Sequence, residues 1–196
     1  MNTNGWKDSQ EEEAIKNEEG LRKIVHIKMK EGRNLVRVLH KPKLFRSHWI
    51  NSVQRSVNCD TTCEICATGD KGKLAYMVNI IDRADGILKL WKLSLTLKQA
   101  IETIGDDYGD PINYDLIIVR KGTGFNDTKY TPLPTRESNA LTEEEKKLVL
   151  YDLDKILAPT PKAVVKSYLN GVVPSKEDRK EKSQATNTSD DLPSLG

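Results

Sequence analysis

The stretch His48–Cys66, HWINSVQRSVNCDTTCEIC, contains all three cysteines of the chain, at positions 59, 63 and 66. The Cys63-x2-Cys66 spacing is typical of a metal knuckle, in which a tight turn directs two thiolates at one ion. Cys59 supplies a third sulfur, and zinc requires a fourth ligand. His48 lies eleven residues before Cys59, close enough for a loop to return it. The stretch therefore predicts one zinc ion held by His48, Cys59, Cys63 and Cys66.

Several alternatives to this ligand set stay open at the level of sequence. The other histidines are His26, which lies within a predicted strand, and His40, which ends one and is the reserve ligand. Free buried cysteines require an apolar setting, whereas these thiols lie among polar neighbours. A disulfide would leave one thiol over and needs an oxidising compartment. A catalytic cysteine needs an activating base, and an iron–sulfur cluster normally takes four cysteines.

Four protein ligands would leave no coordination position for water, which predicts a structural zinc rather than a catalytic one. The ion would then order a loop that is too polar to pack by itself. The prediction for the whole chain is accordingly that it is not an enzyme.

Composition and charge limit the function classes. The net charge of the 196 residues is +2, but residues 1–20 carry two Lys and six acids, whereas residues 22–58 carry ten Lys and Arg against Glu31 alone. Such a basic concentration favours a polyanionic partner over a neutral one, although a solvated basic face is the alternative. No run approaches the roughly 18 apolar residues of a membrane span, and the polar N-terminus lacks a secretory signal. We expect a cytoplasmic protein with no membrane partner.

Period-two alternation predicts about five strands, with one helix inside the sheet region and further helices after it. The predicted strands are 22–30, 34–40, 73–83, 87–94 and the compact apolar segment 114–122, and a glycine-containing loop leads to another short strand. The stretch 41–49 is predicted to be irregular. Helices are predicted over 95–105, from a capping box at Thr142 and Glu145 onward, and over 162–171.

These elements predict a mainly β fold with appended helices (α+β), specifically a five-stranded OB-fold barrel with a small zinc-binding insertion at about 45–70. The predicted organisation is an acidic mobile arm (1–20), the barrel core (21–158), a C-terminal helix (159–174) and a disordered tail (175–196).

Aromatic side chains interleave with cations along the chain, as a groove for single-stranded nucleic acid requires. Cations contact phosphates, and rings stack on unpaired bases whatever their identity. The alternation of ILKLWKLS (87–94) places Trp91 with Lys89 and favours an exposed ring, although Trp91 and Tyr76 could equally be core residues. The candidate contacts are Arg37, Lys41, Lys43, Phe45, Arg46, Tyr76, Lys89, Trp91, Arg120 and Phe125.

From about Asn34 to Tyr130 the chain resembles the single-stranded DNA-binding (helix-destabilising) proteins of T-even-like phages. The resemblance lies in NLVRVLHKPK (34–43), in the His48…Cys59…Cys63-x2-Cys66 pattern, in AYMVNIIDRADGILKLWKLS (75–94) and in YDLIIVRKGTGFNDTKY (114–130). It implies an OB fold with a zinc insertion, and base-stacking roles for Tyr76 and Phe125. The family has a basic N-terminus and a strongly acidic C-terminal tail that recruits replication partners. Here the N-terminal arm is acidic, and Asp190 and Asp191 are the only acidic residues among the last fourteen.

The function expected from these features is sequence-independent binding of single-stranded DNA during phage DNA replication, recombination and repair. Replication or recombination proteins are expected at the C-terminal tail. The alternative is a zinc-ribbon adaptor that docks on a replication or transcription complex. A nuclease is disfavoured because the acidic residues do not cluster amid the strands with metal-ligand spacing.

Overall fold

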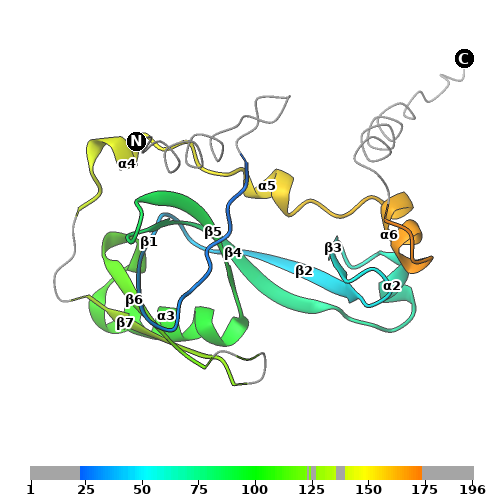
Figure 1. The fold of residues 1–196 in the computed structure, drawn as a ribbon, viewed down its shortest axis with the longest axis horizontal. Coiled ribbons are helices and arrows are strands. Elements are labelled where there is room, and N and C mark those ends of the chain that lie inside the picture. The colour runs from blue at the N-terminus through cyan, green and yellow to red at the C-terminus, as the bar shows by residue number, and fades with distance from the viewer. Residues whose placement is uncertain (1–22, 123, 125–126, 136–139, 174–196) are drawn as a thin grey trace, which may run out of the picture. The chain divides into compact units, whose positions relative to one another are not determined.

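The computed structural model describes residues 23–122, 124, 127–135 and 140–173 (Figure 1). The predicted acidic arm and disordered tail lie outside these residues. The chain divides into two compact units. Unit 1 comprises Met1–Pro42 and Met77–Tyr151, and unit 2 comprises Lys43–Tyr76 and Asp152–Gly196.

Unit 1 is built on antiparallel strands. Their bounds are β1 (Gly32–Val38), β4 (Lys73–Asp82, of which Met77–Asp82 belongs to this unit), β5 (Ile87–Leu93), β6 (Asp115–Lys121) and β7 (Lys129–Pro134). β1 pairs with β4 on one side and β6 on the other, β6 also pairs with β7, and β5 pairs with β4. Fully buried aliphatic side chains from four strands, including Val36, Ile80, Leu90 and Ile118, form the core.

The helix between β5 and β6 begins where the sequence predicts. α3 spans Leu95–Tyr108, and the Ser94 side chain caps it by accepting a hydrogen bond from the Leu97 amide. Leu97 and Ile101, spaced four residues apart, are its buried residues. A short 3-10 helix, η1 (Pro111–Asn113), follows before β6.

Residues 23–30, here called the strap, were expected to form a strand but make only one isolated parallel bridge, between His26 and Leu90. Two hydrogen bonds fix it to β5, from the Ile27 amide to the Leu90 carbonyl at 2.9 Å and from the Leu90 amide to the Val25 carbonyl at 2.8 Å. The alternation of burial survives, because Val25, Ile27 and Met29 are less exposed than their neighbours. The strap therefore has a strand's side-chain pattern with too few ladder bonds to form one.

Unit 2 contains a hairpin and three short helices. Its elements are β2 (Lys43–Ile50), β3 (Arg55–Cys59), α2 (Glu64–Ala67), α5 (Leu153–Ile156) and α6 (Lys162–Leu169), together with the first four residues of β4. One apolar cluster joins the hairpin, α2 and α6. Its buried members are Ile50, Val57, Cys63, Ile65, Val164, Val165 and Tyr168. The C-terminal helix is thus part of the unit that carries the cysteines, which the sequence did not indicate.

The mainly antiparallel α+β class is confirmed, but a closed five-stranded barrel is not. Seven strands form an unclosed sheet in the order β3-β2-β4-β1-β6-β7, with β5 on β4. The expectation that 41–49 is irregular is wrong, because Lys43–Ile50 is strand β2. Within the described residues, no helix is long and apolar enough to cross a membrane.

The helix predicted from Thr142 is interrupted. The capping box of Thr142 and Glu145 is present, yet α4 spans only Glu143–Lys146. Both backbone groups of Tyr151 are bonded to the Asn79 side chain, at 3.1 and 3.0 Å, and the Asp152 side chain then caps α5. These tertiary bonds hold the chain extended where the local pattern favours a helix.

Candidate metal centre and basic groove

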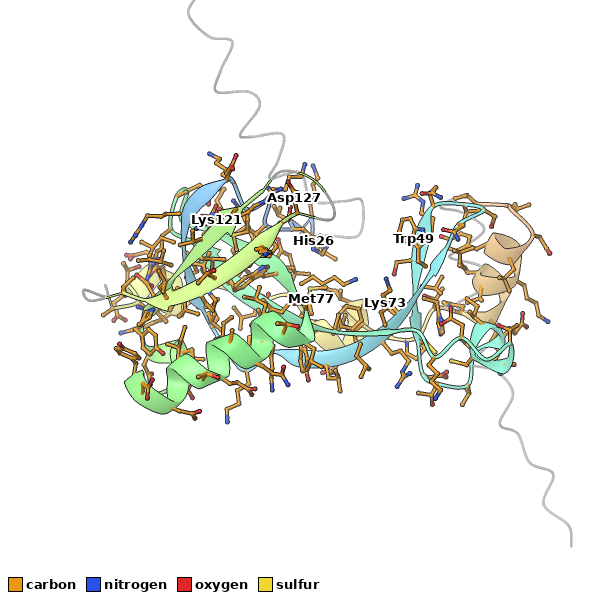
Figure 2. All side chains as sticks on the ribbon, turned by 90° about the horizontal axis from the view of Figure 1, so that it is seen from below. His26, Trp49, Lys73, Met77, Lys121 and Asp127 are labelled. Atoms are coloured by element: carbon orange, nitrogen blue, oxygen red, sulfur yellow. The ribbon has the colours of Figure 1, made fainter. Side chains whose placement is uncertain are left out.

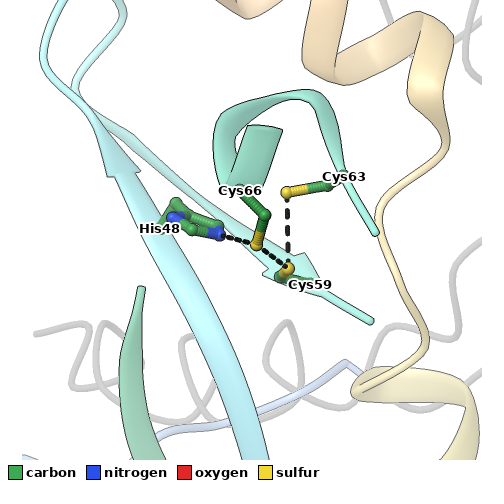
Figure 3. A group of neighbouring side chains, drawn as sticks. All are labelled: His48, Cys59, Cys63 and Cys66. Carbon is green, nitrogen blue, oxygen red and sulfur yellow. Dashed lines mark hydrogen bonds between the residues drawn. The ribbon is translucent and has the colours of Figure 1, made fainter. Parts of the chain in front are cut away.

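His48 and the three cysteines converge in unit 2 (Figure 3). The Sγ atom of Cys59 lies 3.3 Å from the Sγ atoms of both Cys63 and Cys66. His48 Nε2 lies 3.3 Å from the Cys66 sulfur, and all four ligand atoms are within 4.8 Å of one another. This cluster could hold one metal ion.

Strand register brings the histidine to the thiols. In the β2–β3 hairpin, Arg46 is paired with Cys59 and His48 with Val57. Paired positions share a face and alternate residues return to it, so His48 and Cys59 lie on the same face of the hairpin. Cys63 then occupies the N-cap position of α2 and Cys66 lies within that helix, so a single turn presents both sulfurs.

The sulfur separations are compatible with one shared ion, and no disulfide joins the three cysteines. Zn–S bonds of about 2.3 Å give sulfur–sulfur edges of about 3.8 Å, so the sulfur atoms, which are 3.3 Å apart here, would have to move slightly apart to bind zinc. A disulfide would require about 2.05 Å, and all three cysteines are free. The Thr61 amide donates a hydrogen bond to the Cys59 sulfur at 3.1 Å, and Thr61 itself has a positive φ of 79°. Such a bond stabilises a thiolate, the form that a metal requires.

The thiols differ in acidity. Burial alone would raise the pKa of Cys59, but hydrogen bonds from the Thr61 amide and from Cys63, Cys66 and His48 outweigh it and lower the pKa to about 7. The hydrogen bond that Cys66 shares with Cys59, followed by burial, raises the pKa of Cys66 to about 12. One thiol is therefore readily ionised near neutral pH, and another must give up its proton when a metal binds.

His40, the reserve ligand, is engaged elsewhere. Its Nδ1 is 2.8 Å from the Lys41 carbonyl, and its Nε2 accepts from the Asn79 amide at 3.2 Å. The structure thus selects His48. It also adds Asp70, which sequence reasoning missed, because its Oδ2 lies 3.4 Å from His48 Nδ1.

Unit 1 contains a groove of about 550 Å³ beside the strap. Its lining residues come from the strap, β5, the start of α3, β6 and β7, and none of these described residues is acidic. They are His26, Ile27, Lys28, Met29, Leu90, Trp91, Lys92, Ser94, Leu97, Arg120 and Tyr130. In Figure 2, His26 marks the strap, and Lys121 and Asp127 mark the connection from β6 to β7.

The groove combines fixed and accessible groups. Arg120 donates from Nη1 to the Met29 carbonyl at 2.6 Å, which joins β6 to the strap. Lys28 and Lys92 are exposed, and the Tyr130 side chain is 41% exposed. Trp91 is 5% exposed, so the expectation of an exposed ring is wrong and Trp91 contributes to the groove floor. Lys28 and Lys92 were not among the predicted contacts.

The other predicted contacts are dispersed. Arg37 is 2% exposed and its Nε bonds Asp115 at 2.6 Å, which disfavours a phosphate contact. Lys89 is held by Asp82 and Asp85, whereas Lys41 is exposed. Four predicted residues belong to unit 2, and Phe125 lies outside the described residues. Two of the four are cations: Lys43 pairs with Asp154, and Arg46 donates to the Lys71 carbonyl. The other two, Phe45 and Tyr76, are half-buried rings.

Comparison of the chain with protein-family models, with curated proteins and with solved structures gives no match.

Proposed function

We propose that this chain binds single-stranded DNA without sequence preference through the unit 1 groove, and that a structural zinc ion holds the cysteine-bearing part of unit 2. The observation that carries the proposal is the groove, in which three cationic side chains and two aromatic rings meet and in which none of the lining residues that the structure describes is acidic.

The groove chemistry suits an unpaired strand. Lys28, Lys92 and Arg120 would contact successive phosphates, and the exposed face of Tyr130 would stack on one base. In a duplex the bases are stacked on one another inside the helix. Its phosphates could still contact the groove cations, but its bases could not stack on the Tyr130 ring. Stacking serves every base alike, which accounts for the proposed lack of sequence preference.

The order and pairing of the strands in unit 1 support an OB-type fold for the unit that contains the groove. Its five strands have a helix after the third, and the first strand, β1, lies between the second, β4, and the fourth, β6. The strap occupies one edge of β5 by backbone hydrogen bonding. Insertion of β2, β3 and α2 between the first two of these strands agrees with the phage resemblance in its order along the chain.

A structural role for zinc follows from the surroundings of the cluster. Cys63 and Ile65 belong to one buried apolar cluster with Val165 and Tyr168 of α6. From the sequence we expected the cysteine-containing loop to be too polar to pack, and this expectation is wrong. The four protein donors would fill the coordination shell of a four-coordinate zinc ion and would leave no position for a reacting water. Zinc would therefore fix the positions of the β2–β3 hairpin and α2, which pack against α6.

The test measures fluorescence anisotropy with a labelled oligo-dT and with a labelled duplex. We expect clear preference for the single strand, and a loss of about 5- to 150-fold for Tyr130→Leu, since one base stack contributes about 1–3 kcal/mol. Tyr108→Leu is the matched control, because Tyr108 is an exposed tyrosine of unit 1 outside the groove.

Equal affinity for both DNA forms, or equal effects of the two tyrosine substitutions, would overturn the proposal. Absence of oligonucleotide binding with a metal still bound would instead favour the adaptor. Trp49, 55% exposed on β2, would then be a candidate partner contact (Figure 2).

A further inference from the structure

The imidazole of His48 has two nitrogens in different surroundings. Nε2 faces the sulfurs, 3.3 Å from Cys66. Nδ1 is buried and has no partner within hydrogen-bond geometry, but it makes an ionic contact with Asp70 Oδ2 at 3.4 Å. A metal on Nε2 leaves the proton on Nδ1, and a buried N–H without an acceptor is costly.

The turn after α2 holds the Asp70 carboxylate in place. Asp70 Oδ1 accepts the Gly72 amide at 2.7 Å, which leaves Oδ2 on the side of the histidine. Gly72 has φ of +62°, and a Cβ there would lie 2.9 Å from Cε1 and 3.1 Å from Nε2 of His48. A side chain at position 72 would therefore collide with the imidazole ring, and the positive φ of this turn also favours glycine.

We infer that Asp70 is a positioning residue of the metal centre: its carboxylate accepts the Nδ1 proton of His48 and keeps Nε2 directed at the ion. The inference rests on the proposed metal centre. An imidazole N–H bonded to a carboxylate is fixed in orientation and is a more basic ligand, and loss of such partners commonly weakens metal binding by about 10- to 100-fold.

The test compares Asp70→Asn with Asp60→Asn in the full chain. Each substitution removes one negative charge from an exposed residue near the cysteines, and each leaves an oxygen for the local turn, in which Asp60 accepts from the Thr62 amide. Only position 70 faces His48, where an asparagine amide would place a second donor against Nδ1–H.

Zinc affinity is measured by competition with a chromogenic chelator, and the His48 ring nitrogens are observed by 15N NMR in the zinc-bound proteins. We expect Asp70→Asn to lose about 10- to 100-fold in affinity and to change the Nδ1–H signal. Asp60→Asn should lose less than about threefold, because solvent screens an exposed charge.

Equal losses in the two variants, or an unchanged Nδ1–H signal in Asp70→Asn, would overturn the role of Asp70 while leaving the metal centre intact. Failure of the unsubstituted chain to bind zinc would overturn the metal centre and the inference together. Neither result affects the DNA proposal, which the oligonucleotide titration tests independently.

Discussion

Removal of two groove lysines should change the salt dependence of DNA binding by a calculable amount. Each phosphate neutralised on a single strand contributes a slope of about −0.7 to log K against log salt, so Lys28, Lys92 and Arg120 together give about −2. The double substitution Lys28→Ala, Lys92→Ala should make the slope shallower by about 1.4. Between 50 and 200 mM salt, the groove contribution would weaken binding about 18-fold with all three cations and about threefold with Arg120 alone.

The assay is a titration of labelled oligo-dT at four or more salt concentrations. The double variant Lys147→Ala, Lys155→Ala is the charge-matched control, because both lysines are exposed and neither lines the groove. Cations elsewhere would add equally to the slopes of the unsubstituted and groove-substituted proteins, so the difference of about 1.4 isolates the groove. An unchanged slope in the groove variant, or an equal change in the control, would refute the assignment of the DNA site.

Three further outcomes follow from the two units. Chelation of the metal, or the substitution Cys63→Ser, should abolish hydrogen-exchange protection in the β2–β3 hairpin and in α6, whereas protection in β1 and β6 should persist. Retention of protection in α6 would contradict the structural role of zinc. Zinc affinity should rise at least about tenfold per pH unit between pH 7 and 8 in a chelator competition, because Cys66, whose pKa is raised to about 12, must lose its proton. The dependence should steepen below about pH 7, where Cys59 is also protonated, and a flat profile would exclude thiolate ligation. Asp115→Ala should lower the free energy of unfolding by about 3–5 kcal/mol in urea denaturation, since it removes the buried carboxylate that Arg37 and Arg83 share, whereas Glu143→Ala at an exposed pair should cost less than about 1 kcal/mol; equal costs would show that the ion pairs of Asp115 are not the source of the effect.

Local sequence patterns predicted those features that depend on a few neighbouring residues. The Cys63-x2-Cys66 knuckle, the β4–β5 hairpin, the start of α3 at Ser94 and the capping box at Thr142 all appear as expected. Each is determined within one turn of helix or one tight connection, where spacing alone fixes geometry.

Alternation in a strand indicated which residues share a face, but not which face is covered. Trp91 and Lys89 do share a parity, yet Trp91 is buried, because that face of β5 contributes to the core of unit 1. Arg37 is buried by its pairing with Asp115, 78 residues away in sequence. Burial of a basic or aromatic side chain depends on distant partners, which periodicity does not reveal.

The sequence by itself therefore determined the candidate set of metal ligands, the mainly β character and the concentration of positive charge. The tertiary structure decided that His48 rather than His40 joins the thiols, because hairpin register sets its face. It also joined α6 to the unit that contains the candidate metal ligands, and it brought Lys28, Arg120 and Tyr130 from three separate segments into one groove. Such convergence arises from the burial of apolar surface and from pairing between distant strands, and both depend on contacts that no local stretch of sequence contains.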